Sequence, residues 1–532
     1  MTPDIFRRRL LDRTVRAALL GGLLAKAPAA AWGADASDSS DSSDASDLSE
    51  PEDIAEDFAH EIWDVVVVGS GTAGLCAAIA AREAGARRVV ILEKLALTGG
   101  HGILSSGSVA VATRRPQSED PDADIREMTA EMLRAGGDLA RPELVRKLAR
   151  ESESAVAWLA GMGVNWRNVW YRAVGSVTAR NISTGSPQAG YDYVSALSRR
   201  AVAIGAEIRH NTRAVRLLTE TIPDGSVQVV GVRAALGGVD DRGAPSMADF
   251  PARAVVLATG GFGANVGMRM KYAPRLDATY GTTANPNRDL LDGAEGDGIR
   301  MAEAVGAELV GMEHIQLIPY SGGRLLDFVG GEIWVNDAGE RFVPEGVPFA
   351  ELARIVEDTG NRSFWAISDA TTQKGASLGV KLDEAIVREA ATIEEMAHGM
   401  DVPVGVLRRT IETWNRDVKR GYDTRFGFPV QGVPIAKPPF YYGRETWSVH
   451  FTCGGVAIDE EARVLTARRR PIFGLFAAGE VTGGVHGKDR LGGMSMTDTF
   501  VFGRTAGRSA AAYAGRLLRN EGTDAASATG AP

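Results

Sequence analysis

Cysteine is scarce in this 532-residue sequence, which contains only Cys76 and Cys453. Two cysteines this far apart do not have the spacing of a zinc or iron–sulfur site, and neither belongs to a CxxCH haem-attachment motif. No metal site is therefore predicted. No apolar run reaches the roughly 20 residues that a membrane-spanning helix needs. The body of the chain lacks a clustered basic stretch and the formal net charge is −9, so nucleic-acid binding is not expected. A cofactor would have to be held by the backbone and by other side chains.

The N-terminal region differs in composition from the rest of the chain. Arg7, Arg8 and Arg9 precede a short apolar stretch at 17–24, and a small-residue run follows at 29–31. This pattern predicts a twin-arginine-type signal peptide over residues 1–33, and hence a periplasmic location; a basic disordered tail is the alternative. The next segment is rich in Ser, Asp and Glu without Lys or Arg, so residues 34–60 are predicted to be an acidic disordered linker.

A phosphate-binding turn is predicted where the globular region begins. An apolar run over 62–68 leads directly into the six residues 69–74, Gly-Ser-Gly-Thr-Ala-Gly, and an alanine-rich helical pattern follows over 75–85. A second apolar strand over 88–92 ends at Glu93. The glycines allow the backbone to approach a pyrophosphate, and the acid is placed to accept hydrogen bonds from a ribose. Together these elements predict a Rossmann-type dinucleotide site.

Three later segments repeat glycine-rich turns of this kind. Residues 98–107 are rich in Gly and Ser, while 254–263 and 472–480 each combine an apolar strand with a glycine turn. Because these segments are spread over four hundred residues, we predict one nucleotide domain that is interrupted by an insertion. Such an arrangement is unusual for enzymes that use NAD.

These segments resemble the flavoprotein family of fumarate reductase, succinate dehydrogenase and L-aspartate oxidase, including soluble flavocytochrome c. The likeness runs from about residue 64 to about 516 and is clearest over 479–493, GEVTGGVHGKDRLGG, and over 297–302. The resemblance implies FAD as the cofactor and an α/β fold in which an inserted α+β capping domain interrupts a Rossmann-like FAD-binding domain. The FAD-binding domain is predicted to comprise residues 61–318 and 440–520, with the capping domain at 319–439 and a flexible tail at 521–532.

The motifs and the resemblance together give a set of candidate FAD-binding residues. We expect FAD to be bound noncovalently; the alternative is attachment through the histidine near the early glycine-rich segment. The candidates are Gly69, Gly71, Thr72, Ala73, Gly74, Glu93, Lys94, Gly99, Gly100, His101, Ser106, Gly107, Val215, Thr259, Gly260, Gly261, Asp297, Gly479, Glu480, Gly492 and Ser495.

An anion clamp is predicted from two further motifs. The segment 450–455, His-Phe-Thr-Cys-Gly-Gly, resembles the family motif whose histidine binds a substrate carboxylate. Arg490 stands where the family has an arginine that holds the same group. A guanidinium forms paired, charge-assisted hydrogen bonds with a carboxylate, so His450 and Arg490 are predicted to be catalytic.

The chain departs from the family at two other places. Ile318 replaces the histidine of Gln-x-His-Pro, and an isoleucine cannot pair with a second carboxylate. Phe349 stands at the position of the arginine that donates the proton, and the stretch 325–331 lacks the family's Glu-x-x-Arg relay. Arg354 is therefore the predicted proton donor, provided that its loop is rearranged. Tyr280, His314 and Tyr320 are the alternatives.

The sequence thus predicts an exported FAD-dependent oxidoreductase acting on CH–CH bonds, which interconverts an α,β-unsaturated monocarboxylate and its saturated form. A ketosteroid dehydrogenase-like enzyme is the main alternative, since that branch shares the FAD domain. A catalytically silent electron carrier is the third possibility. Because no haem, iron–sulfur or NAD(P)H motif is found, a separate electron-transfer partner is expected, either a c-type cytochrome or a quinone-linked protein.

Overall fold

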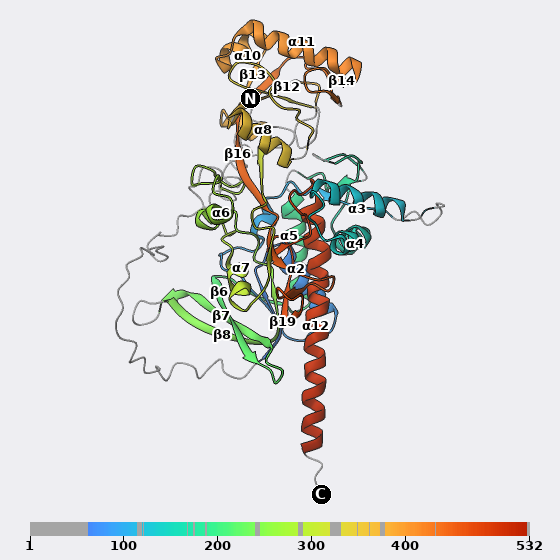
Figure 1. Ribbon diagram of the computed structural model, residues 1–532, viewed down its shortest axis with the longest axis vertical. Coiled ribbons are helices and arrows are strands. Elements are labelled where there is room, and N and C mark those ends of the chain that lie inside the picture. Colours follow the sequence, from blue (N-terminus) through green and yellow to red (C-terminus); the bar gives the residue numbers. More distant parts are fainter. Residues whose placement is uncertain are drawn as a thin grey trace, which may run out of the picture. The chain divides into compact units, whose positions relative to one another are not determined.

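The computed structural model (Figure 1) describes residues 62–113, 120, 122–167, 169–173, 176–186, 189–239, 245–285, 291–319, 331–347, 349–360, 362–372, 378–430 and 432–528. Residues 63–286 and 292–532 belong to one compact unit. The predicted signal peptide and acidic linker lie outside the described residues, as do Tyr320 and most of the segment 325–331.

An eight-stranded sheet forms the centre of this unit. Its neighbouring parallel strands are, in order, β5 (Glu207–Arg209), β2 (Val89–Leu92), β1 (Trp63–Val68), β8 (Pro245–Leu257) and β19 (Pro471–Ala477). Strands β1 and β2 read as continuous buried apolar runs, as expected for parallel strands covered on both faces. This arrangement confirms the predicted Rossmann-like α/β fold.

Antiparallel strands extend this sheet on one side. The first half of β8 pairs with β7 (Val227–Val239), which in turn pairs with β6 (Thr212–Thr221), and β18 (Arg463–Leu465) borders β19. The same strand β8 thus carries both a long antiparallel ribbon and the strand-to-glycine turn that follows Leu257.

Helices α2 (Thr72–Glu83) and α12 (Met494–Ala528) pack closely against each other. A Cβ on Gly503 would lie 2.7 Å from the carbonyl oxygen of Ala73, and a Cβ on Gly507 would lie 2.1 Å from that of Ala77. The two helices therefore meet through their backbones. Helix α12 continues through residues 521–528, beyond the predicted end of the FAD-binding domain at 520.

The remaining elements outside the predicted insertion surround this centre. They are the 3-10 helix η2 (Gly100–Leu104), the helices α3 (Ala123–Ala135), α4 (Pro142–Ala160), α5 (Ala189–Ala203), α6 (Val266–Tyr272) and α7 (Asp297–Ala304), and the short strands β3 (Val109–Ala110), β4 (Asn181–Ile182), β9 (Leu309–Val310), β17 (Gly455–Ala457) and β20 (Thr482–Gly483).

The inserted region is built on a second sheet. Strand β16 (Phe440–Thr452) pairs with β10 (Ile315–Pro319) at one end and with β12 (Ser363–Ser368) and β13 (Val387–Ala390) at the other, and β12 pairs with β11 (Ile333–Val335). In Figure 1, β16 leads from this region into the rest of the unit. The other elements of the insertion are α8 (Phe349–Thr359), α9 (Leu378–Asp383), α10 (Ile393–Met400), α11 (Val404–Arg420), β14 (Tyr422–Asp423) and β15 (Phe428–Pro429).

The second sheet separates two hydrophobic cores. Trp334 and Phe364 point into the core that is shared with the FAD-binding domain. Ile333, Val335 and Ile367 point the other way, into a separate core beneath α10 and α11. This alternation follows from the two-residue period of a strand. The insertion therefore has a core of its own and is also packed onto the main one.

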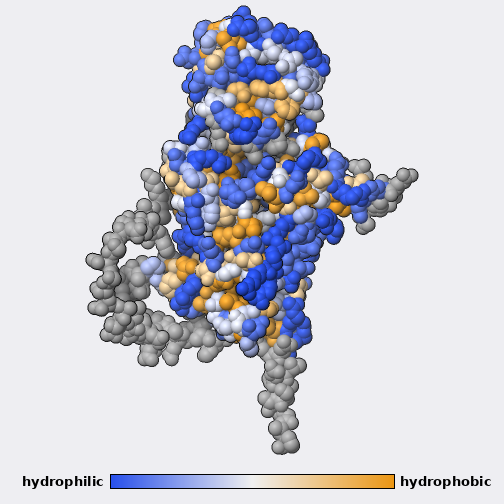
Figure 2. All heavy atoms as spheres, viewed as in Figure 1, coloured by the Kyte–Doolittle hydropathy of each residue, from blue (hydrophilic) through white to orange (hydrophobic). Residues whose placement is uncertain are grey.

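No helix among the described residues is long and apolar enough to cross a membrane. Figure 2 shows hydrophilic residues along the exposed side of α12 and apolar residues in scattered patches on the same face. Single exposed apolar residues are normal on a protein surface and indicate no particular partner.

Gly507→Ala is expected to destabilise the fold by about 1–3 kcal/mol, because the new methyl group would collide with the α2 backbone. Gly515→Ala in the same helix is the matched control, since its nearest non-neighbouring atom would be 3.6 Å away in the flexible side chain of Arg519. The control should gain about 0.5–1 kcal/mol from helix propensity. Urea unfolding of both variants measures this, and equal effects would contradict the close helix contact.

Candidate active site

The glycine turn after β1 brings three backbone segments together. A Cβ on Gly69, where φ is +100°, would lie 2.4 Å from the carbonyl oxygen of Ala258, and a Cβ on Gly74 would lie 1.9 Å from that of Gly69. Gly71 differs, because no non-neighbouring atom lies closer than 4.0 Å to its built Cβ, and α2 begins there without a side-chain cap. The helix N-terminus therefore has open space in which a phosphate could accept hydrogen bonds from N–H groups.

Glu93 lies beside this turn at the end of β2. One of its carboxylate oxygens accepts hydrogen bonds from the Ser70 N–H at 2.9 Å and from the Ser70 hydroxyl at 2.6 Å; the other accepts from the Leu95 N–H at 2.8 Å. The Gly99 N–H donates to the Ser70 carbonyl at 3.1 Å, which holds the glycine-rich segment 98–107 against the same turn. These bonds fix the carboxylate where a ribose would reach it.

The turns after β8 and β19 form the opposite side of the site. A Cβ on Gly261 would lie 2.0 Å from the Thr452 hydroxyl and 2.4 Å from a carboxylate oxygen of Glu480. That Glu480 oxygen accepts hydrogen bonds from the Thr452 N–H at 2.9 Å and from its hydroxyl at 3.0 Å. Burial raises the pKa of Glu480 above its ordinary value. The hydroxyl of Thr259 is buried without a protein partner, which indicates a place for a polar ligand group.

Four other predicted cofactor residues are engaged in ion pairs or exposed at the surface. Lys94 forms ion pairs with Glu295 at 2.9 Å and with Asp297 at 2.8 Å, so these charges are engaged with one another. Val215 on β6 is 43% exposed, and Ser106 is also exposed. Their roles as cofactor residues stay predictions.

The C-terminal signature lies against the other segments of the site. Gly479 has φ of +77°, and a Cβ there would lie 2.9 Å from the Ala73 side chain. The Gly492 carbonyl accepts a hydrogen bond from the buried Asn181 side chain at 2.9 Å, and Ser495 lies in the first turn of α12. Asn181 itself was not singled out from the sequence, because nothing in its local sequence distinguishes it from an ordinary loop asparagine.

His101 contacts an acidic side chain inside the site. Its Nε2 lies 2.6 Å from Asp292, whose second oxygen accepts the hydroxyl of Thr282 at 2.5 Å. Burial opposes the protonation of His101, but the hydrogen bond and charge of Asp292 outweigh it, so the pKa of His101 is raised. The same pairing, against the opposing effect of burial, lowers the pKa of Asp292. The pair could not be predicted, because its members are 191 residues apart in the sequence.

Arg490 is a buried cation, with 5% of its surface exposed. One terminal nitrogen donates to the side-chain oxygen of Gln316 at 2.8 Å, the other donates to the Leu491 carbonyl at 3.2 Å, and Nε has no protein partner. Its guanidinium lies 5.2 Å from the centre of the Phe451 ring. Burial lowers the pKa of Arg490 from its ordinary value, although an arginine stays protonated. The Asp489 carboxylate and the Arg490 carbonyl both accept hydrogen bonds from the Gln316 amide.

His450 occupies a bulge in β16. Gln316 of β10 pairs with Phe451, and the next residue of β10, Leu317, pairs with Val449. His450 is therefore an extra residue of β16 between these two pairs. A bulge redirects a side chain locally and is common beside active sites. The Nδ1 atom of His450 lies 3.0 Å from the Thr283 hydroxyl. Both predicted clamp residues therefore lie at the pairing of β10 with β16. Arg490 donates a hydrogen bond to Gln316 of β10, and His450 directly precedes Phe451, the residue of β16 that pairs with Gln316.

The other predicted catalytic residue lies at the surface. Arg354 is on α8, where its guanidinium is 63% exposed and pairs with Asp358 at 2.7 Å. Among the alternatives, Tyr280 is buried beneath Arg362, and His314 is partly buried with Nε2 3.5 Å from Glu313. The assignment of Arg354 as proton donor stays a prediction.

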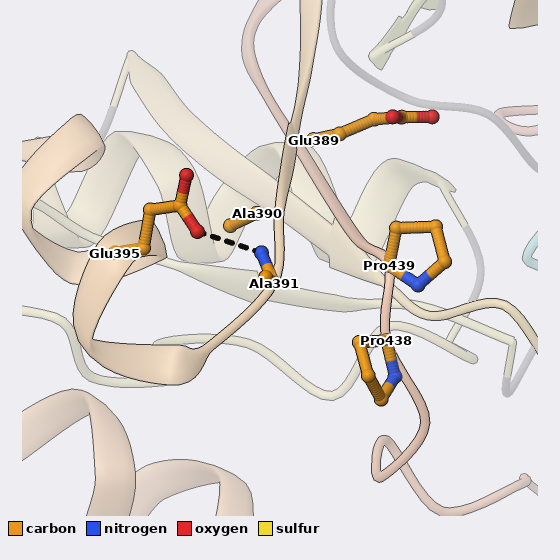
Figure 3. A pocket seen from close by; sticks show the side chains of 6 residues that line it. All are labelled: Glu389, Ala390, Ala391, Glu395, Pro438 and Pro439. Atoms are coloured by element: carbon orange, nitrogen blue, oxygen red, sulfur yellow. Dashed lines mark hydrogen bonds between the residues drawn. The ribbon is translucent and has the colours of Figure 1, made fainter.

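Figure 3 shows a pocket in the predicted insertion. The residues that line it are Glu389, Ala390, Ala391, Glu395, Pro438 and Pro439. A carboxylate oxygen of Glu395 accepts a hydrogen bond from the Ala391 N–H at 2.8 Å. Two acidic side chains line this pocket and none of the candidate residues does, so a carboxylate substrate is not expected there.

The glycine turn, the acid at the end of β2 and the buried unpaired hydroxyl are compatible with FAD. A match to the FAD binding domain family over residues 64–496 identifies the chain as an FAD-dependent oxidoreductase. The chain is 36% identical to the urocanate reductase of Eggerthella lenta, over 85% of this chain and 75% of the relative. It therefore belongs to the fumarate reductase-like family of FAD-binding flavoproteins.

Two solved structures show the same architecture. The open conformation of a flavocytochrome c3 fumarate reductase matches with a TM-score of 0.66 and 31% identity, covering 85% of this chain and 79% of the other. The 3-ketosteroid-Δ4-(5α)-dehydrogenase of Rhodococcus jostii RHA1 matches with a TM-score of 0.63 and 26% identity, covering 86% and 99%. The predicted family, cofactor and enzyme class are confirmed.

Gly71→Ala is expected to lower FAD occupancy at least about tenfold while leaving the flavin-free fold intact. The methyl group meets no protein atom closer than 4.0 Å, but it would occupy the space that the pyrophosphate needs. The ratio of flavin to protein absorbance measures occupancy, and thermal unfolding of the apoprotein measures the fold. Gly405→Ala on α11 is the control and should retain flavin; full flavin retention in Gly71→Ala would contradict the site.

The His101–Asp292 pair predicts a pH-dependent stability. Because the pKa of His101 is raised on folding, the pair's contribution is present below the unfolded histidine value of about 6.5 and is lost as pH rises through the folded value. The difference in unfolding free energy between wild type and His101→Gln should therefore shrink from pH 6 towards pH 9. Denaturant titrations at several pH values measure it, and a constant difference would contradict the charged pair.

Proposed function

We propose that this chain is an exported FAD-dependent reductase of α,β-unsaturated monocarboxylates. The observation that carries the proposal is the buried guanidinium of Arg490, whose Nε has no protein partner. A buried hydrogen-bond donor without a partner is costly, and a guanidinium suits a carboxylate, so this position favours a carboxylate ligand. Phe451 beneath the guanidinium and Gln316 beside it set its orientation.

The preference for a single carboxylate rests on Ile318. This residue is buried in β10, two positions after Gln316, and side chains two apart along a strand share a face. An apolar group there offers nothing to a second carboxylate but would pack against an apolar substituent. Urocanate, the compound in the name of one relative, is an enoic acid with one carboxylate.

The residues divide the chemistry among themselves. When bound, FAD supplies the hydride-transfer chemistry. Arg490 and His450 would hold the carboxylate and so fix the carbon–carbon double bond in place, which removes much of the entropic contribution to the barrier. The positive charge of Arg490 would also stabilise negative charge that develops on the substrate. The inserted domain would exclude water, and Arg354 remains our candidate for the proton donor.

A ketosteroid dehydrogenase-like activity is the second candidate. The similarity to a solved enzyme of that class supports it at the level of fold. A steroid ketone, however, has no anion to offer to Arg490, and it would lack the paired, charge-assisted hydrogen bonds that a carboxylate forms with a guanidinium. We therefore place this activity behind enoate reduction.

The electrons are proposed to come from a separate partner. Export is inferred from the arginine-rich segment at 7–9, followed by an apolar stretch. A c-type cytochrome or a quinone-linked protein in the same compartment is the partner we propose.

Arg490→Ala should reduce kcat/KM for the best enoic acid by about 100-fold, because about 3 kcal/mol of charge-assisted binding is lost. Arg490→Lys should recover some of this loss, since it keeps the charge without the fork of donors. Steady-state kinetics with a chemical electron donor measures both variants.

The matched control is Arg408→Ala on α11, an exposed arginine paired with Glu394. This variant should keep wild-type kinetics and flavin content. Unchanged turnover of every accepted substrate by Arg490→Ala, with flavin retained, would overturn the proposed clamp.

A further inference from the structure

The bulge at His450 is held by a loop from a distant region of the chain. The Val449 N–H donates to the Gly281 carbonyl at 2.9 Å, and the Thr283 N–H donates to the Val449 carbonyl at 2.9 Å. Residues 281–283 thus form hydrogen bonds with both backbone groups of Val449, the residue immediately before His450. The same loop places the Thr283 hydroxyl 3.0 Å from His450 Nδ1.

This loop is itself rigidly anchored. Thr282 and Asn285 bond to each other through both backbone groups at 3.1 Å, and the Thr282 hydroxyl accepts the Asn285 N–H at 2.9 Å. The Thr282 hydroxyl also donates to Asp292 at 2.5 Å. Asp292 in turn is held by the Ala294 N–H at 3.0 Å and by His101 at 2.6 Å. Thr283 is therefore presented to the imidazole from a fixed base.

We propose that Thr283 is a positioning residue that orients the His450 imidazole for carboxylate binding. Its contact with Nδ1 fixes the ring so that Nε2, on the opposite edge, faces away from the loop. A hydroxyl suits this purpose because it donates to a bare nitrogen and accepts from a protonated one. The contact can therefore persist when His450 gains a proton beside a bound anion. The inference deepens the proposed function and rests on it for the identity of the ligand.

A double-mutant cycle tests the coupling. Crotonate is titrated into the holoenzyme and its dissociation constant is read from the flavin absorbance. Thr283→Val, which keeps the shape but removes the hydroxyl, should weaken binding about fivefold to tenfold, whereas Thr283→Ser should stay within about twofold of wild type. In a His450→Ala background, Thr283→Val should have no further effect. An equal loss in that background would overturn the proposal, because it would show a purely structural role.

A second measurement does not depend on the ligand. The ring ¹⁵N chemical shifts of His450, identified by their loss in His450→Ala, report which nitrogen carries the proton. We expect Thr283→Val to move these shifts towards values typical of a solvated histidine, and Thr283→Ser to preserve them. Identical shifts in wild type and Thr283→Val would overturn the positioning role. A wild-type enzyme that binds no crotonate or other enoate but shows the expected shift change would sink the proposed function and leave the Thr283 assignment standing.

Discussion

The close approach of backbones around α2 is the constraint on which the rest of the structure depends. The helix meets the β1 turn at Gly74, the β19 turn at Gly479, and α12 at Gly503 and Gly507. A side chain at any of these four positions would collide with an atom of another segment. Because all four are glycines, segments that are four hundred residues apart can converge on the N-terminus of one helix.

The open space at Gly71 follows from this convergence. At the neighbouring glycines, protein atoms occupy the space where a side chain would stand. At Gly71 this space is open and could hold a ligand. Dinucleotide phosphates need such a place, because they are bound through N–H groups that no side chain caps. The same packing brings Thr452 of β16 onto Glu480, so the strand that carries His450 ends beside the glycine turn that follows β19.

The buried guanidinium of Arg490 is the second feature that shapes the site. Arg490 is sequestered among Phe451, Gln316 and backbone carbonyls, with one nitrogen left unpaired. A ligand that accepts a hydrogen bond from this nitrogen would satisfy it. Ile318 is a buried apolar residue on the same strand as Gln316, and in the proposed function it offers no partner to a second carboxylate.

Local sequence patterns predicted the elements that depend on local physics. The strands before Gly69 and Glu93 appear as β1 and β2, and the helical pattern at 75–85 appears as α2, with ends that differ by one to three residues. Glycine spacing identified the nucleotide turn because the turn itself requires glycine. The resemblance identified Arg490 and His450, which spacing alone would not have done.

The remaining features depend on contacts between distant segments. The bulge at His450 exists only because β10 and β16 pair in one register, and Thr283 contacts it through a loop 167 residues earlier. The pairing of Lys94 with Asp297 and the surface position of Arg354 are likewise set by tertiary packing. No periodicity or motif within a short window encodes such contacts.

The most direct test of the account is the reoxidation of chemically reduced holoenzyme under anaerobic conditions. Reduced flavin is mixed with a panel of enoic monocarboxylates, with fumarate and with a 3-ketosteroid, and the return of the oxidised-flavin absorbance is followed. The account predicts rapid reoxidation by at least one monocarboxylate and slow reoxidation by fumarate. Reoxidation by the steroid, or by no monocarboxylate at all, would contradict it.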